Sequence, residues 1–246
     1  MKKIIGQITA AVVLIMVSAA VFFAHFEVYH DRKFIIDWLL GSLAFLPISV
    51  LVVSLILDRI IASREKEMLL HKLNMVIGAF FSEAGNGLLK LLVKHASIGS
   101  DIKPSLLING KWGRSDFKNA SANLRGYMYG FEADKINLVE LCRFLSSKRS
   151  FLLRLLENQN LLEHETFTDL LWAVFHVTEE LESRKNLKKL PAPDKIHISG
   201  DIQRAFVILV VQWVGYMGHL KEQYPYLFSL AVRTNPFDAK ARAEVN

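Results

Sequence analysis

The sequence predicts an all-α protein in which an N-terminal two-helix transmembrane hairpin is followed by a cytosolic helical bundle. Residues 4–24 and 34–57 form two apolar runs joined by nine residues, and each run reaches across a hydrocarbon layer of roughly 30 Å at about 1.5 Å per residue. Later in the chain, apolar residues recur at helical spacing without convincing strand-type alternation. We expect residues 1–61 to form the hairpin, 62–237 a helical domain and 238–246 a disordered tail.

The charges beside the two apolar runs predict their orientation. Two lysines precede the first run, and the second run is followed by Arg59, Arg64, Lys66 and Lys72. The positive-inside rule places both chain ends in the cytoplasm and the hairpin in the cell membrane. The first run also has features of a signal peptide, including Ser18-x-Ala20, but its apolar stretch continues to Ala24 and favours an uncleaved span. Both alternatives leave the C-terminal part in the cytosol.

Composition narrows the class of function. The net charge of +6 is spread along the chain, whereas a nucleic-acid-binding protein concentrates its basic residues, so we expect no nucleic-acid partner. Cys142 is the only cysteine, which excludes an intramolecular disulfide and a cysteine-rich zinc site. The sequence contains no phosphate-binding glycine loop, nucleophile elbow or HExxH motif. These absences favour a non-enzymatic protein without a cofactor.

The helical domain is predicted to begin as a continuation of the second apolar run. We expect Gly85-Asn86-Gly87 to bend or break this helix. Further helices are predicted over residues 116–127, 137–157, 165–184, 202–224 and 225–232. Ser115 is interpreted as the N-cap of the first of these, and Pro191 and Pro193 are interpreted as part of a linker.

Arg149 presents two alternatives, because it falls on the apolar face of the helix predicted over residues 137–157. Either the segment 147–150 breaks the helix, or Arg149 pairs with a carboxylate, since an unpaired buried charge is costly. The break is the preferred interpretation.

One face of the helix predicted over residues 165–184 carries carboxylates and an imidazole. They belong to Glu165, Asp169, His176 and Glu180, at intervals of four, seven and four residues. This spacing can present oxygen and nitrogen ligands to a divalent metal ion. Amphipathic helices also carry such groups on a solvated outer face, and the solvated face is the preferred interpretation. The four residues are kept as candidate metal ligands.

A second group of residues predicts contact with another chain. Trp172 shares the polar face of residues 165–184, and an exposed tryptophan among acidic residues is typical of an interface. The helix over residues 202–224 is apolar on opposite sides, so it is either buried centrally or shared between subunits. The candidate interface residues are Trp172, Ile208, Val211 and Trp213.

Four segments carry a resemblance to a known family. They are HKLNMVIGAFFSE at 71–83, KRSFLLRLLEN at 148–158, EHETFTDLLW at 163–172 and YPYLFSLAVRTNPF at 224–237. The chain resembles a family of uncharacterised prokaryotic integral membrane proteins. The resemblance implies a membrane hairpin with a cytosolic helical domain, and it implies no activity.

The expected function is a membrane-anchored, non-enzymatic helical scaffold or interaction module that assembles with itself. The expected partners are the lipid bilayer, further copies of the chain and a protein at the cytosolic domain. One alternative is a homo-oligomeric pore or small transporter, because two spans can line a channel only by oligomerising. The other is a metal-dependent hydrolase that uses the four candidate ligands.

Overall fold

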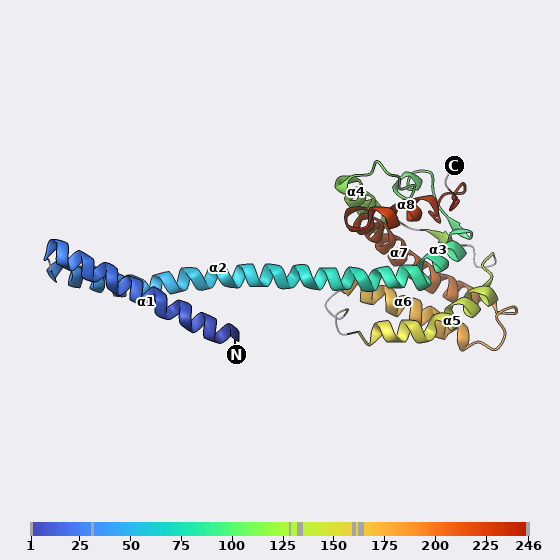
Figure 1. The fold of residues 1–246 in the computed structure, drawn as a ribbon. Coiled ribbons are helices and arrows are strands. Elements are labelled where there is room, and N and C mark those ends of the chain that lie inside the picture. The colour runs from blue at the N-terminus through green and yellow to red at the C-terminus, as the bar shows by residue number, and fades with distance from the viewer. Residues whose placement is uncertain are drawn as a thin grey trace. The chain divides into compact units, whose positions relative to one another are not determined.

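The computed structural model describes residues 2–30, 32–127, 129–131, 135–158, 161 and 165–244. These residues are mostly helical, as the sequence predicts (Figure 1). The α-helices are α1 (Lys2–Tyr29), α2 (Arg32–Phe80), α3 (Asn86–Val93), α4 (Arg114–Arg125), α5 (Leu138–Leu156), α6 (Glu165–Glu182), α7 (Ala192–Gln223) and α8 (Pro225–Arg233). The shorter elements are a π-helix at Phe81–Gly85, a 3-10 helix at Lys103–Ser105 and the strands β1 (Ala96–Ser97) and β2 (Gly130–Phe131). Internal contacts divide the chain into two compact units, Met1–Lys66 and Glu67–Asn246.

The first unit consists of α1 and the N-terminal part of α2. The two helices are joined by a shorter connection than the nine residues predicted, because α1 continues to Tyr29. His30 has a φ of 51°, the left-handed conformation that commonly follows the end of a helix. Aromatic rings pack between the helices: Phe22 meets Trp38 edge-on at 5.1 Å, and the ring of His25 stacks on Phe34 at 4.8 Å.

Both helices of the first unit contain a segment that is long and apolar enough to cross a membrane, judged by length and composition. The mean hydropathy is 2.2 for the segment in α1 and 2.5 for the segment that begins in α2. None of the residues in the most apolar part of either segment is buried. Pro47 lies inside α2 without ending it. A proline there removes one backbone hydrogen bond from the helix.

The second unit is a helical domain built around α7. This helix packs most extensively against α6 and α4, and it also contacts α3, α8 and β2. Its buried apolar residues include Ile198, Ile202, Phe206, Leu209, Val210, Trp213, Val214 and Met217. Two apolar sides of α7 are therefore covered within the chain, and the helix occupies the centre of the core.

The chain stays helical at residues 85–87, where a bend or break was predicted, and a π-helix at Phe81–Gly85 directly precedes this point. α2 passes at Phe80 into the π-helix, and α3 follows from Asn86. A Cβ atom at Gly85 would lie 2.6 Å from the Phe81 ring and 2.8 Å from the Phe80 ring, so a larger residue would displace both. Phe80 and Phe81 are both fully buried, although they are adjacent in sequence. Phe80 meets Phe167 of α6 edge-on, and Phe81 stacks on Tyr216 of α7.

The helix break preferred at residues 147–150 is wrong, because α5 continues through this segment. Arg149 instead donates to Glu182 of α6 at 2.8 Å and lies 3.6 Å from Glu179. Its guanidinium also lies 4.7 Å from the centre of the Phe175 ring. The Arg149 side chain keeps 36% of its surface exposed, so its charge remains partly hydrated while it pairs with two carboxylates.

Two predicted helix starts are also wrong. α4 begins at Arg114 and is capped at Gly113, whose N–H donates to Asp116 Oδ2 at 2.7 Å, so Ser115 lies inside the helix. The segment interpreted as a linker is the start of α7, with Pro191 as N-cap and Pro193 in the first turn. Proline suits this position because its fixed φ is helical and the first-turn N–H groups lack intrahelical partners.

Two short segments differ from the sequence-based expectations. β1 and β2 pair antiparallel, with Ala96 opposite Phe131 and Ser97 opposite Gly130, whereas no strand was predicted. Residues 238–244, expected to be disordered, include turns, and the Ala241 N–H donates to the Asp238 carbonyl at 3.0 Å.

Candidate metal centre

A cluster of imidazoles and carboxylates lies where α6 packs against α7. Each helix supplies one histidine and one acid four residues later: His176 and Glu180 on α6, and His197 and Asp201 on α7. Residues four apart lie on the same face of a helix, so each pair projects from one side of its helix. The packing of the two helices brings the pairs together.

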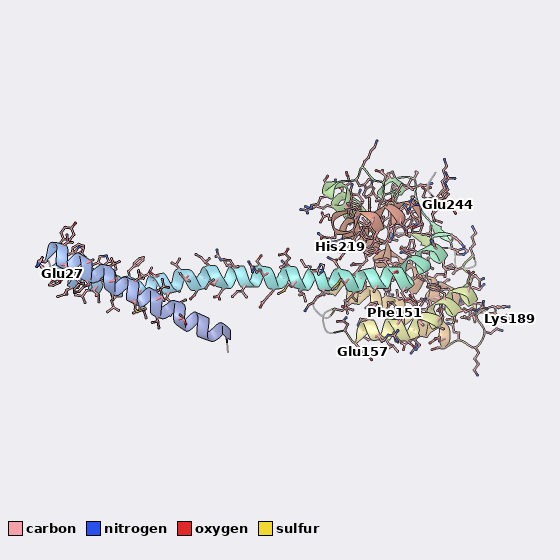
Figure 2. All side chains as sticks on the ribbon, viewed as in Figure 1. Glu27, Phe151, Glu157, Lys189, His219 and Glu244 are labelled. Carbon is pink, nitrogen blue, oxygen red and sulfur yellow. The ribbon has the colours of Figure 1, made fainter. Side chains whose placement is uncertain are left out.

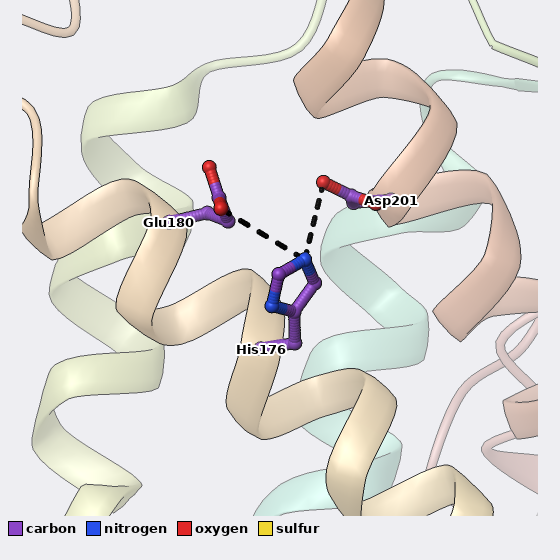
Figure 3. Close-up of side chains that lie close together, drawn as sticks. All are labelled: His176, Glu180 and Asp201. Carbon is purple, nitrogen blue, oxygen red and sulfur yellow. Dashed lines mark ion pairs between the residues drawn. The ribbon is translucent and has the colours of Figure 1, made fainter.

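The side chains of His176, Glu180 and Asp201 approach one another closely (Figure 3). His176 Nε2 lies 3.5 Å from Asp201 Oδ2 and 3.9 Å from Glu180 Oε1. His197 Nε2 lies 3.4 Å from Asp201 Oδ2 and 3.6 Å from Glu180 Oε2. One ligand atom each from His176, Glu180 and Asp201 can be chosen so that all lie within 4.8 Å of one another. The arrangement can therefore share one cation.

Asp201 is the most buried member of the cluster. Only 5% of its side-chain surface is exposed, and its Oδ2 atom has no hydrogen-bond partner among the residues that the structure describes. This oxygen points toward the His176 imidazole in Figure 3. Such isolation of a buried carboxylate oxygen is unusual, because an unpartnered buried polar atom lowers stability.

The second oxygen of each carboxylate interacts with an arginine. Arg184 donates to Glu180 Oε2 at 2.6 Å and forms two further hydrogen bonds with Asp194. This guanidinium holds the pKa of Glu180 below its usual range, and it also lowers the pKa of Asp194. Arg204 Nη1 lies 3.2 Å from Asp201 Oδ1. The two arginines thereby orient the carboxylates. Glu180 Oε1 and Asp201 Oδ2 lie near His176, whereas Glu180 Oε2 contacts Arg184 and also lies 3.6 Å from His197.

A hollow of about 370 Å³ adjoins the cluster. It is lined by Asp169, Trp172, Ala173, His176, Asp201, Arg204 and Ile208. The His176 and His197 side chains are each about half exposed, so water and ions can reach their nitrogen atoms. The site thus combines one buried acid with accessible imidazoles beside a mixed polar and apolar surface.

The sequence-based candidate ligands are only partly brought together. His176 and Glu180 belong to the cluster, and Asp169 lines the neighbouring hollow. Glu165 lies in the first turn of α6, about 16 Å along the helix axis from His176. His197 and Asp201 were not predicted as ligands. Pro191 and Pro193 were interpreted as part of a linker, and the next helix was predicted to begin only at residue 202. The repeated pattern of a histidine followed four residues later by an acid was the available signal.

The candidate interface residues occupy different environments. Trp172 has 57% of its surface exposed, and Ile208 lines the same hollow. Val211 is partly buried against the core. Trp213 is 1% exposed and packs against Phe237, with ring centres 5.1 Å apart, so its side chain is part of the core instead of a free surface.

The fold and the cluster define a mostly helical protein with two apolar N-terminal helices and a histidine–carboxylate cluster in its second unit. Residues 2–61 match the profile of the family described as MJ1433, N-terminal helical domain, and residues 69–233 match Uncharacterized protein MJ1433, C-terminal helical domain. The chain belongs to this uncharacterised family, which confirms the family expected from the sequence.

A relative in Methanocaldococcus jannaschii supports the same assignment. The chain is 43% identical over 231 residues to Uncharacterized protein MJ1433 of that organism, and the alignment covers 94% of this chain and 93% of the relative. No solved structure matches this chain. The relationship thus defines the family along nearly the whole length and attaches no activity to it.

Proposed function

We propose that this protein is a membrane-anchored, non-enzymatic helical module, with two spans in the cell membrane and its second unit in the cytosol. The supporting observation is the apolar surface of α1 and the first part of α2. Exposed residues on these helices include Leu14, Ile15, Val21, Phe23, Leu39, Leu43, Leu51 and Ile56. The charged residue Glu27, labelled in Figure 2, lies beyond the apolar run of residues 4–24, close to the end of α1.

The energetic argument favours lipid around these helices. Removing one large apolar side chain from water contributes roughly 1.5–3 kcal/mol, and the two helices expose many such side chains. Together they favour a lipid environment by tens of kcal/mol, to order of magnitude. A water-soluble protein with a surface of this kind would aggregate, because contiguous apolar patches of such size associate.

The charges flanking the helices support an orientation with both chain ends inside. Basic residues follow the second apolar run at Arg59, Arg64 and Lys66, and two lysines precede the first. Arg32 and Lys33, at the start of α2, weaken this asymmetry without reversing it. The second unit accordingly lies in the cytosol.

The interaction role is supported by Trp172. A tryptophan that exposes 57% of its surface beside the half-buried Ile208 offers the kind of aromatic anchor that is enriched at protein interfaces. We propose that this face joins two copies of the chain. The symmetry of such a dimer would place the same patch on both subunits.

Membrane anchoring is tested by fractionation and cysteine labelling in intact cells. After Cys142→Ser removes the only native cysteine, His30→Cys places a thiol in the connection between α1 and α2, and Ser146→Cys places one on the exposed side of α5. A membrane-impermeant maleimide should label the first variant in intact cells and the second only after lysis. Release of the protein by alkaline carbonate, or labelling of the second variant in intact cells, would contradict the proposal.

Self-assembly is tested by native mass spectrometry of the full chain released from nanodiscs. Wild type should give a closed oligomer of intact chains, and Trp172→Ala should shift it toward monomer. Tyr226→Ala is the matched control, because Tyr226 is an aromatic residue on α8 with 71% of its surface exposed. A monomeric wild type, or equal effects of both substitutions, would refute assembly through the Trp172 face. The same spectrum reports whether residues 4–24 are retained.

A further inference from the structure

We propose that His176, Glu180 and Asp201, whose ligand atoms converge, bind one divalent transition-metal ion, for which Zn²⁺ is the best-fitting example. His197, which lies 3.4 Å from Asp201 and 3.6 Å from Glu180, is the fourth ligand in this proposal. Two imidazole nitrogens and two carboxylate oxygens form a mixed donor set that suits Zn²⁺ and related ions. Mg²⁺ and Ca²⁺ prefer oxygen ligands alone. This inference does not depend on membrane anchoring or on self-assembly.

The spacing of the donor atoms fits a tetrahedral ion. Bonds of about 2.0–2.1 Å to Zn²⁺ place neighbouring ligand atoms about 3.3 Å apart. The imidazole-to-carboxylate separations run from 3.4 Å, between His197 Nε2 and Asp201 Oδ2, to 3.9 Å, between His176 Nε2 and Glu180 Oε1. Ligand atoms of His176, Glu180 and Asp201 all lie within 4.8 Å of one another. Binding of the ion therefore requires the side chains to move inward.

The distances do not fit a set of direct histidine–carboxylate hydrogen bonds. A charge-assisted N–H···O bond is about 2.7–2.9 Å long, and every imidazole-to-carboxylate separation in the cluster is at least 3.4 Å. Asp201 Oδ2 faces both imidazoles and forms a hydrogen bond to neither of them. Side chains that converge at this spacing leave space for an ion between them.

The buried position of Asp201 gives the ion an energetic role. An ionised carboxylate that is almost fully removed from water is costly unless a cation or hydrogen-bond donors compensate it. Arg204 compensates Oδ1 at 3.2 Å, and a bound metal ion supplies the missing partner of Oδ2. Arg184 similarly occupies Glu180 Oε2 and leaves Oε1 available to the ion.

The metal ion links the two most extensively packed helices of the second unit. Two ligands come from α6 and two from α7, so binding stabilises the α6–α7 pair by the free energy of coordination. His176 and Asp201 also line the hollow beside Trp172 and Ile208. Metal binding thus fixes one wall of the surface that we propose as an interface.

The test uses the full-length chain without a histidine tag, stripped with chelator and held in detergent micelles. Isothermal titration with ZnCl₂ should show one tightly bound ion per chain, and Co²⁺ should give the intense visible absorption of tetrahedral coordination. Mg²⁺ at large excess should not compete. Thermal unfolding should shift upward on addition of Zn²⁺.

Asp201→Asn, His176→Gln and His197→Gln should each weaken Zn²⁺ binding about ten-fold or more. The two histidine variants are the safer tests, because their side chains are half exposed and their loss should not unfold the helices. Glu165→Gln is the matched control on α6 and should bind Zn²⁺ like wild type. Absence of Zn²⁺ binding to the folded wild-type chain would overturn the site. Binding unchanged in both histidine variants would overturn the ligand assignment.

Discussion

Asn235 provides the sharpest test of how the C-terminal segment is held. It is 2% exposed, its Nδ2 donates to the Leu106 carbonyl at 2.9 Å, and its Oδ1 accepts from the Phe237 N–H at 2.9 Å. Asn235→Ala removes both bonds. The buried Leu106 carbonyl and the buried Phe237 N–H then lose the Asn235 side chain as a hydrogen-bond partner. Unsatisfied buried groups cost about 1–3 kcal/mol each, so the free energy of unfolding should fall by about 2–6 kcal/mol.

Asn235→Asp keeps the hydrogen bond from Phe237 and removes the one to Leu106 at neutral pH. The carboxylate still accepts from Phe237, but at neutral pH it faces the Leu106 carbonyl with a second acceptor oxygen. Burial and this contact raise the folded-state pKa of the introduced carboxyl above its unfolded value of about 3.9. The destabilisation is therefore fully present above the raised folded pKa and decreases as pH falls toward the unfolded pKa, because the protonated carboxyl donates to Leu106.

The assay is urea unfolding of the full chain in micelles, followed by tryptophan fluorescence. Trp213 packs against Phe237, so it reports directly on this segment. Asn235→Asp should be less stable than wild type at about pH 7 and recover part of the difference near pH 4.5. Asn235→Ala should show no such relative recovery. A loss below about 0.5 kcal/mol for the alanine variant, or parallel pH profiles for both variants, would refute the role assigned to these bonds.

Two further predictions concern charged groups of the second unit. Burial, followed by the nearby His71, lowers the pKa of His219, although Glu222 opposes this shift. The unfolded chain then takes up the proton first, so the free energy of unfolding should fall as pH drops below about 6.5, and His219→Asn should reduce that slope in urea unfolding. Arg149→Ala should cost only about 1 kcal/mol, because exposed ion pairs and cation–π contacts each contribute modestly. High salt should narrow this difference in thermal unfolding, and a loss of several kcal/mol would contradict the partly hydrated environment of Arg149.

Periodicity was sufficient to predict the helical class and several helices, because it depends only on neighbouring residues. The helix predicted over residues 165–184 corresponds closely to α6, Glu165–Glu182, and the helix predicted over residues 137–157 corresponds to α5, Leu138–Leu156. The start of α7 was missed because prolines such as Pro191 and Pro193 occur both in linkers and in the first turn of a helix. The packing of α7 against the other helices favours the helical turn over the linker.

Half of the histidine–carboxylate cluster was missed through the same boundary error. With residues 191–201 outside the predicted helix, His197 and Asp201 were not placed on a common face. Even with the correct boundary, their approach to His176 depends on the packing of α6 against α7, which no local pattern specifies. Arg149 illustrates the same limit, because the carboxylates and the aromatic ring that accommodate it all lie on α6.

The π-helix at Phe81–Gly85 shifts the phase of the chain between α2 and α3. A π-turn closes its hydrogen bond over one more residue than an α-turn, and one residue in an α-helix corresponds to a rotation of about 100°. This extra residue allows Phe80 and Phe81 to enter the core side by side. Regular α-helical winding of the same residues would rotate α3 about the helix axis relative to the end of α2 and move the buried side chains of α3 out of place. The π-helix therefore determines the rotation of α3 relative to the end of α2.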